Sequence, residues 1–510
     1  MDTADPLGAR SAPRTPSAGL AQEAIGLREV FFQSVTHMAP AAAVAFSIIA
    51  GAGFAAGALP LAVILALIGC LLVALSIGQL ARHLPSAGSF YTYTARGIHP
   101  GVGFLVAWAY AVAEPLVAPL LFLIFGHLVA NTLHQELGWN YGQWWWPAAL
   151  FAAVVVFVLG YFGIRISART GTILGLFEIG VFTALAVWLI AKAGSANTLA
   201  VFGTKFATAK GFVGIGGVVA GSIYTILAFI GFEAAAPLAE ETRDPRRNIK
   251  LAVVYSCICI GVFYVLTTYA ATVYFGPGKF GGFGSFGGGN PWDGLARAVW
   301  GGGWFIVFLA IANSAIANSN AAANATTRTW FAMGRIRLLP GFFAHTHPRY
   351  KSPDVAVVAQ FVVGVVLTLV LGAKYGPFPV AFILVATIDT AIIIAIYMLV
   401  NVSCILFYIR EQRAEFNVLL HGILPLAGIA AFVPAFFTAV GVGKSVFSFV
   451  VPLPSPYNLV GIIDGILMGV GVIYLIVLSV VAPKRIRDTG RVFIDEPEVA
   501  AQLGTAPAAV

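Results

Sequence analysis

The sequence predicts an all-α integral membrane protein with twelve transmembrane helices. Apolar and aromatic residues make up 59% of its 510 residues, charged residues only 10%, and its mean hydropathy is +0.90. Soluble proteins carry roughly 25% charged residues. This composition therefore excludes an ordinary soluble enzyme, a disordered chain and a collagen-like fibre. The apolar residues also lie in continuous runs, and a run of about 20 residues is long enough to span a bilayer.

These runs are separated by charged or turn-rich breaks. They are continuous rather than alternating, so they predict helices and not the strands of a membrane barrel. The remaining segments are tails of about 30 residues and shorter loops, too short for a separate soluble domain. The predicted spans are approximately 31–56, 58–82, 101–130, 145–164, 170–192, 212–236, 250–275, 302–332, 354–372, 378–409, 421–442 and 457–482.

The positive charges predict how the chain is oriented. The net charge is +8. If the N-terminus lies inside, most Lys and Arg residues fall in cytoplasmic tails and loops, including Arg243–Lys250 and Lys484–Arg491. This bias predicts a plasma membrane protein with both termini in the cytoplasm. It also accounts for the charge without a nucleic-acid partner. The polar segment 1–30 has no signal-peptide core and predicts a disordered cytoplasmic tail.

The sequence offers no catalytic or metal site. Its cysteines, Cys70, Cys257, Cys259 and Cys404, all fall within predicted spans and have no zinc-type spacing. No nucleophile motif and no nucleotide-binding motif is present. We therefore expect no enzyme activity, no cofactor and no metal, and an energy source other than ATP.

Two predicted spans contain residues that interrupt a helix. Pro40 in the first span has no N–H and its ring clashes with the carbonyl of Thr36. The sixth span carries Gly231, Glu233 and Pro237 within seven residues. Broken helices at corresponding places of two repeats are where transporters bind substrates and ions. The first and sixth spans are five apart, as an inverted repeat of five plus five helices requires.

Three stretches resemble the amino acid–polyamine–organocation transporter superfamily. Phe229-Ile-Gly-Phe-Glu233 with Leu238–Ile249 resembles its sixth-span signature. Leu84-Pro-Ser-Ala-Gly88-Ser-Phe-Tyr91 resembles its loop after the second span. Arg328–Arg335, followed by Leu339-Pro340, resembles its motif after the eighth.

The resemblance implies the LeuT-like fold, with two inverted five-helix repeats and a site between the broken first and sixth helices. It divides the chain into the tail 1–30, a transport core 31–410, two further helices in 411–482, and a cytoplasmic tail 483–510. Counting back from the Pro85 loop puts the family's first-span break on Ala42-Ala43-Val44, which contains no glycine. Pro40 is the alternative source of the break. The candidate substrate-binding residues are Pro40, Ala41, Ala42, Ala43, Val44, Glu114, Leu227, Ala228, Phe229 and Gly231.

Acidic residues inside the spans are the candidates for coupling. A carboxylate within a membrane helix is costly and predicts a functional site. Glu233 is assigned to gating or proton sensing, because a buried carboxyl group can take up and release a proton. Glu178 is a candidate proton or cation site, where several family members carry a Lys. Glu114, one turn after Tyr110, is expected to pair with a substrate ammonium or guanidinium, or to serve as a structural partner for a neighbouring helix.

Other features are assigned more local roles. Asp389, with Tyr397 and Asn401, forms a polar stripe that could join an outer gate, and Asp464 is expected to be structural. The glycine-rich segment 276–290 predicts a flexible extracellular linker.

The sequence thus predicts a secondary transporter of amino acids, working by alternating access and coupled to protons. A half-helix N-terminus suits a substrate carboxylate, and unwound carbonyls suit its ammonium group. Three alternatives stay open. They are a polyamine, other amine or cation as substrate, an amino acid exchanger, and a sensor that binds without transport.

Overall fold

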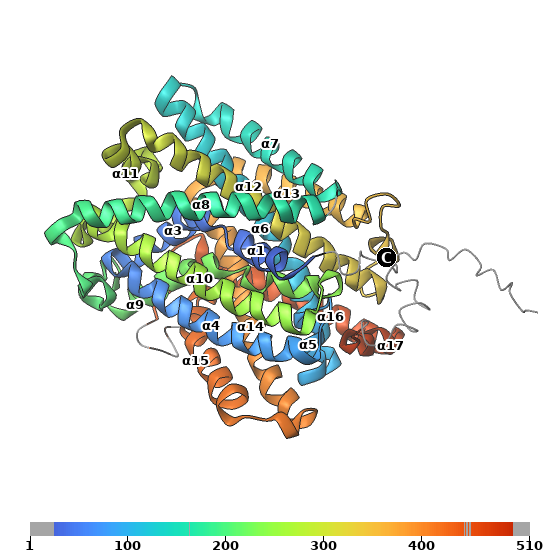
Figure 1. Cartoon of the computed structure of the whole chain (residues 1–510). Coiled ribbons are helices and arrows are strands. Elements are labelled where there is room, and N and C mark those ends of the chain that lie inside the picture. The colour runs from blue at the N-terminus through green and yellow to red at the C-terminus, as the bar shows by residue number, and fades with distance from the viewer. Residues whose placement is uncertain (1–24, 163, 443, 445–446, 448–449, 493–510) are drawn as a thin grey trace, which may run out of the picture.

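The structure is a bundle of helices, described by a computed structural model for residues 25–492 except 163, 443, 445, 446, 448 and 449. In Figure 1 the long helices run side by side, with α3, α9 and α11 towards one end and α5 and α17 at the other. The helices are α1 (Leu27–His37), α2 (Pro40–Ala42), α3 (Ile48–Ala55), α4 (Leu59–His83), α5 (Phe90–Gly97), α6 (Pro100–Leu137), α7 (Tyr141–Phe162), α8 (Ile164–Ala193), α9 (Ile215–Phe229), α10 (Pro245–Phe275), α11 (Pro291–Trp300), α12 (Trp304–Arg335), α13 (Asp354–Tyr375), α14 (Phe382–Arg410), α15 (Leu424–Val440), α16 (Val460–Val481) and α17 (Pro483–Arg487), with one antiparallel strand pair, β1 (Thr208–Ala209) and β2 (Phe212–Val213).

Eleven helical stretches of the described chain are long and apolar enough to span a membrane. One of them, Leu27–His83, has 57 residues. At 1.5 Å per residue it would be about 85 Å long, roughly twice the full thickness of a bilayer including its headgroups. Its helical geometry is lost at Ala56, where φ is +48°, between the first two predicted spans. The all-α membrane fold is confirmed, and the count of twelve crossings stays a prediction.

The sixth span lies at the centre of the bundle. In Ile215–Glu241 the most apolar window is 94% buried, against 17% in Tyr457–Val481. Helix α9 packs against α3, α4 and α15, whereas α16 exposes apolar side chains such as Ile462 and Ile466. The protein itself therefore surrounds the segment in which the sequence predicts the site.

The first span breaks between α1 and α2. Ala39 adopts a left-handed conformation, with φ +49° and ψ +67°, and Pro40 is the first residue of α2. Because Pro40 has no N–H to offer, the carbonyl of Thr36 accepts the N–H of Ala39 instead, at 3.1 Å. The expectation that the break falls on Ala42-Ala43-Val44 is wrong. Those residues are helical, since they belong to α2 and to the π-helical segment η1 (Ala43–Ser47) that follows it.

The sixth span breaks at Ile230 and Gly231. Helix α9 ends at Phe229, and the 3-10 segment η6 (Phe232–Glu241) begins after Gly231. Gly231 has φ +118°, which L-residues with a side chain rarely adopt. A Cβ atom there would also lie 2.7 Å from Cγ of His37. The two breaks therefore lie in direct contact, and glycine is needed both for its backbone conformation and for this close approach.

Two hydroxyl side chains join the broken segments. Ser34 Oγ donates to the Phe232 carbonyl at 2.8 Å and accepts the Ala235 N–H at 3.2 Å. The hydroxyl of Tyr264, on α10, lies within hydrogen-bond distance of the carbonyls of Met38 and Ala228. These are backbone groups that an unbroken helix would satisfy by itself.

The glycine-rich segment is folded. It forms the 3-10 segment η7 (Pro277–Gly289), in which the rings of Phe280 and Phe283 are fully buried and stack with their centroids 4.7 Å apart. Asn131 also donates to the Gly288 carbonyl at 3.0 Å. The prediction of a flexible linker is wrong, because these two phenylalanines are spaced by three residues, the period of a 3-10 helix, and share one apolar face.

We predict that Gly231→Ala destabilises the protein by about 2–4 kcal/mol, because the new methyl group forces a disfavoured φ and meets His37. The measurement is thermal unfolding in detergent, followed by tryptophan fluorescence. Gly53→Ala is the matched control, since a Cβ atom at Gly53 meets nothing within 4 Å. Equal melting temperatures for the two variants would contradict the role assigned to Gly231.

Candidate functional site

A cavity lies beside the two helix breaks. Three of the predicted binding residues, Ala43, Leu227 and Ala228, line it. The other predicted residues of the two broken spans, Pro40, Ala41, Ala42, Val44, Phe229 and Gly231, are buried in the same segments but are not among its lining. The full lining is His37, Met38, Ala39, Ala43, Ser47, Val117, Leu120, Leu121, Leu227, Ala228, Ile230, Asn318 and Asp389.

Glu178 belongs to α8, and its side chain reaches the start of the second half of the first span. Its Oε2 accepts the Ala41 N–H in a long hydrogen bond of 3.4 Å, and its Oε1 accepts the side-chain N–H of Asn313, on α12, at 2.5 Å. The carboxyl group of Glu178 is buried. It therefore occupies the N-terminus of the half-helix, the kind of position that favours a negative charge.

Glu233 holds the corresponding place in the sixth span. Its Oε2 accepts the N–H of Gly231 at 3.0 Å, and the residue is fully buried. Both half-helix N-termini thus already have a carboxyl group from the protein. The sequence predicted these N-termini as the place for a substrate carboxylate. In this structure such a carboxylate would have to displace Glu178 or Glu233.

Glu114 contacts the cavity through another residue. Its Oε1 lies 3.2 Å from Nε2 of His37, and both side chains are buried. His37 lines the cavity, whereas Glu114 lies behind it. Glu114 is therefore placed to position His37 rather than to touch a ligand directly. Sequence reasoning missed His37, although its place just before the Pro40 break was a usable signal.

Asp389 is the acidic residue that faces the cavity. It comes from α14, it is fully buried, and neither carboxyl oxygen has a hydrogen-bond partner among the described residues. Asp389, Glu114 and Glu233 are close enough to one another to interact electrostatically. No Lys or Arg is among the described lining residues, so an ionised Asp389 would suit a cationic group in this cavity. The sequence had placed Asp389 in a possible outer gate.

Comparison with known proteins decides the family. The family model described as amino acid permease matches residues 25–494. The chain belongs to the amino acid permease family.

Individual relatives of this amino acid permease differ in what they carry. It is 28% identical over 367 residues to the low-affinity putrescine importer PlaP of Escherichia coli K12, covering 71% of this chain and 76% of that protein. It is 24% identical over 322 residues to the branched-chain amino acid permease BcaP of Bacillus subtilis, covering 60% and 66%.

A solved structure supports the fold. The crystal structure of a manganese transporter from Eremococcus coleocola aligns with a TM-score of 0.50 and 14% identity, covering 91% of this permease and 94% of that chain. With the family match it establishes the LeuT-like fold of a multi-pass membrane transporter, and at this identity it says nothing of the substrate. Among the described residues, no group of three His, Cys, Asp or Glu is arranged to hold a metal ion.

The three stretches that carry the family resemblance meet in one ion-pair cluster, which we name the Arg335 face. Arg335 pairs with both carboxyl oxygens of Glu240 at 2.8 and 2.9 Å, and Glu240 also accepts the Ala87 N–H at 3.1 Å. Arg328 pairs with Glu241 at 2.9 Å. All four charged side chains are buried. The cluster joins α12, the end of η6 and the loop before α5, so it closes one end of the central helices.

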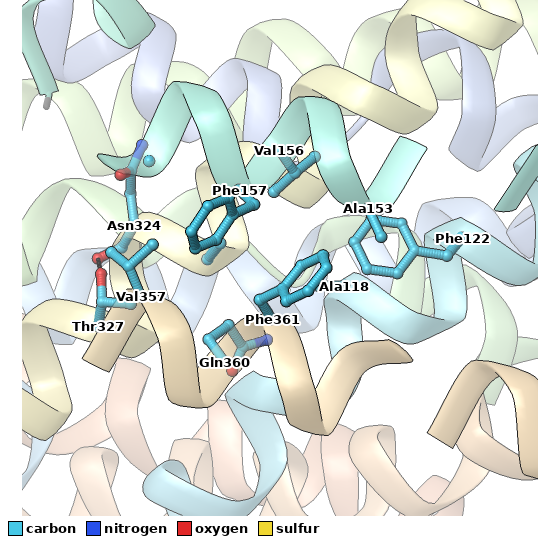
Figure 2. Close-up of a pocket in the computed structure, with 12 residues that line it drawn as sticks. Ala118, Phe122, Ala153, Val156, Phe157, Asn324, Thr327, Val357, Gln360 and Phe361 are labelled. Atoms are coloured by element: carbon cyan, nitrogen blue, oxygen red, sulfur yellow. Dashed lines mark hydrogen bonds between the residues drawn. The ribbon is translucent and has the colours of Figure 1, made fainter. Parts of the chain in front are cut away.

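A second small cavity lies between α6, α7, α12 and α13 (Figure 2), where Asn324 and Thr327 gather at one end and Phe122 lies at the other. It adjoins two prolines of α6 that leave carbonyl groups without their helical partners. Trp330 donates to the Ala111 carbonyl, four residues before Pro115, at 3.1 Å. Gln360 donates to the Pro115 carbonyl, four residues before Pro119, at 3.1 Å. Trp330 and Gln360 therefore have a structural role.

We predict that Arg335→Ala destabilises the permease by about 3–5 kcal/mol, because it leaves the buried Glu240 carboxylate without its partner. The measurement is the thermal unfolding midpoint of the purified protein in detergent. Arg82→Ala is the control. Its partner is Glu415 at 3.7 Å, and both side chains are more than two fifths exposed, so its loss should cost at most about 1 kcal/mol. A small effect at Arg335 comparable to that at Arg82 would rule out a closing role for the cluster.

Proposed function

We propose that this permease moves small amine-bearing solutes, amino acids foremost, across the plasma membrane by alternating access. The observation that carries the proposal is the cavity at the two helix breaks, with the unpaired carboxyl group of Asp389 on its wall and no Lys or Arg among its described lining residues. The proposed orientation has both termini in the cytoplasm, which puts the Arg335 face on the cytoplasmic side.

The amino group of the substrate binds beside Asp389. Two helices, α1 and α9, end at this cavity, and the C-terminal end of a helix carries partial negative charge that favours a cation. Met38, just after α1, and Ala228, in the last turn of α9, both line the cavity. An ammonium group there meets a carboxylate and two helix ends. Glu114 holds His37 at the wall.

The carboxylate of an amino acid binds where a protein carboxyl group now lies. Protonation of Glu233 or Glu178 removes a negative charge from the half-helix N-terminus. The N–H group of Gly231 or Ala41 then becomes available to the substrate carboxylate. Proton uptake and amino acid binding would thus favour each other, which is the thermodynamic basis of symport. This assigns both glutamates to proton coupling.

A diamine is the second candidate substrate. It has no carboxylate, so it leaves Glu178 and Glu233 in place and uses only the negative wall. The filled half-helix N-termini and the similarity to a putrescine importer favour it. The similarity to a branched-chain amino acid permease favours the amino acid. Competition for uptake by the amine alone, without competition by amino acids, would select the diamine.

Alternating access is assigned to the 31–410 core. By analogy with the family, the first, second, sixth and seventh helices rock against the others, and the Arg335 face opens when they do. The helices within 411–482 and the tails 1–30 and 483–510 lie outside this movement. Exchange instead of symport is the alternative, and it would appear as uptake that requires amino acid inside the vesicle.

We predict that Asp389→Asn raises the KM for uptake about 10- to 100-fold, as expected when a charged contact of 1.5–3 kcal/mol is lost. The measurement is radiolabelled uptake into proteoliposomes from a panel of branched-chain and cationic amino acids and putrescine. Asp293→Asn is the matched control, because Asp293 is also buried and unpaired but lies on α11, outside the cavity lining. Equal KM values for the two variants would show that Asp389 does not bind substrate.

We predict that Glu233→Gln abolishes the stimulation of uptake by an inward proton gradient, because glutamine cannot exchange a proton. Uptake rates are compared with and without the gradient at external pH values between about 5 and 8, a range in which a perturbed carboxyl group titrates. Glu178→Gln is measured in parallel. If both variants keep the wild-type response to the gradient, these glutamates do not couple transport to protons.

A further inference from the structure

A third, larger hollow lies away from the helix breaks, and we name it the Asp464 groove. Its empty volume is about 1140 Å³. It is formed by α6, α14, α15 and α16, and apart from Asp464 its lining is apolar. The lining residues are Val102, Leu105, Val106, Ala109, Ala391, Ile392, Ala395, Ile396, Leu399, Phe436, Val440, Gly461, Asp464, Gly465 and Met468.

Asp464 has no partner for its carboxyl group. The residue is 8% exposed, and neither of its oxygens accepts or donates a hydrogen bond within the described part of the chain. Leaving a buried carboxylate unpaired in apolar surroundings costs several kcal/mol, so such a group either takes up a proton or pairs with a cation. The sequence predicted a structural role for Asp464, but the described residues provide no partner for its carboxyl group.

The groove opens where the protein meets the bilayer. On α16, Gly465 is exposed, and its neighbours Ile462 and Ile466 are each 63% exposed. In a membrane helix such side chains face lipid chains. A molecule dissolved in the bilayer can therefore enter from the side without passing through the transport cavity.

We propose that the Asp464 groove binds a membrane-dissolved primary alkylamine. The ammonium group pairs with Asp464, and the alkyl chain lies along Leu105, Ile392 and Ile396. Charge complementarity selects this occupant, because a neutral acyl chain would leave the carboxylate unpaired and an anionic lipid would be repelled.

This site is separate from the substrate cavity. Helix α14 presents Asp389 to the cavity, and Ile392 and Ile396 to the groove. The described linings of the two hollows have no residue in common. Asp389 and Asp464 are still close enough to interact electrostatically, so the groove is a separate binding surface whose charge bears on the cavity.

The test is photo-crosslinking of the full chain in nanodiscs with a radiolabelled dodecylamine that carries a diazirine. We expect saturable labelling of α14 or α16 peptides, displaced by unlabelled dodecylamine and not by dodecanol. Asp464→Asn should lower the labelling at least tenfold. Gly465→Leu should do the same by filling the groove while keeping the carboxylate, and a Cβ atom at Gly465 meets nothing within 4 Å.

Three results would overturn the proposal. Unchanged labelling of Asp464→Asn would mean that the carboxylate does not bind the amine. Equal labelling by a diazirine alcohol of the same length would mean a site for acyl chains only. Crosslinked dimers, with no labelling of monomers, would mean that a second copy covers the groove. Thermal unfolding near the wild-type temperature for both variants confirms that a loss of labelling reflects the site and not misfolding.

Discussion

The structure depends on one constraint, that every backbone N–H and C=O group inside a bilayer needs a partner. An unbroken helix meets this demand by itself, and the first and sixth spans do not, because Pro40 and Gly231 end the hydrogen-bond ladder. The freed groups are met by Glu178, Glu233, Ser34 and Tyr264. These polar residues of the central spans are therefore needed first as partners for the backbone groups at the breaks. The same side chains can then also take part in transport.

The same constraint builds the scaffold beside the site. Two prolines in α6 free the carbonyls of Ala111 and Pro115, and side chains from α12 and α13 satisfy them. A local irregularity in one helix thus becomes a specific link to two others. Two kinds of irregularity result. The breaks in the first and sixth spans border the cavity, whereas α6 stays continuous and its freed carbonyls are met by neutral donors.

Charge is distributed according to this division. The centre of the protein collects carboxyl groups without Lys or Arg on the described cavity wall, while the Arg335 face pairs its buried glutamates with arginines. A paired charge stabilises a closed end, and an unpaired one attracts a cation. Transport by rocking would break the ion pairs of the Arg335 face, and substrate binding would pair the free carboxyl group at the cavity. The family motifs gather at the Arg335 face. They therefore indicate the ion pairs that close this end of the protein, and they do not indicate which substrate is carried.

The sequence by itself determined the all-α membrane fold, the interruption of the first and sixth spans, and the presence of acids within the spans, because span length and local backbone sterics depend on neighbouring residues. Only the tertiary structure decided which acid does what. It brought Glu178 to Ala41 across 137 positions, turned Asp389 rather than Glu114 to the cavity, and placed His37 on the cavity wall next to Glu114. A helix that is apolar all round has no sequence pattern to fix its rotation, so the direction of each polar side chain depends on packing against the other helices.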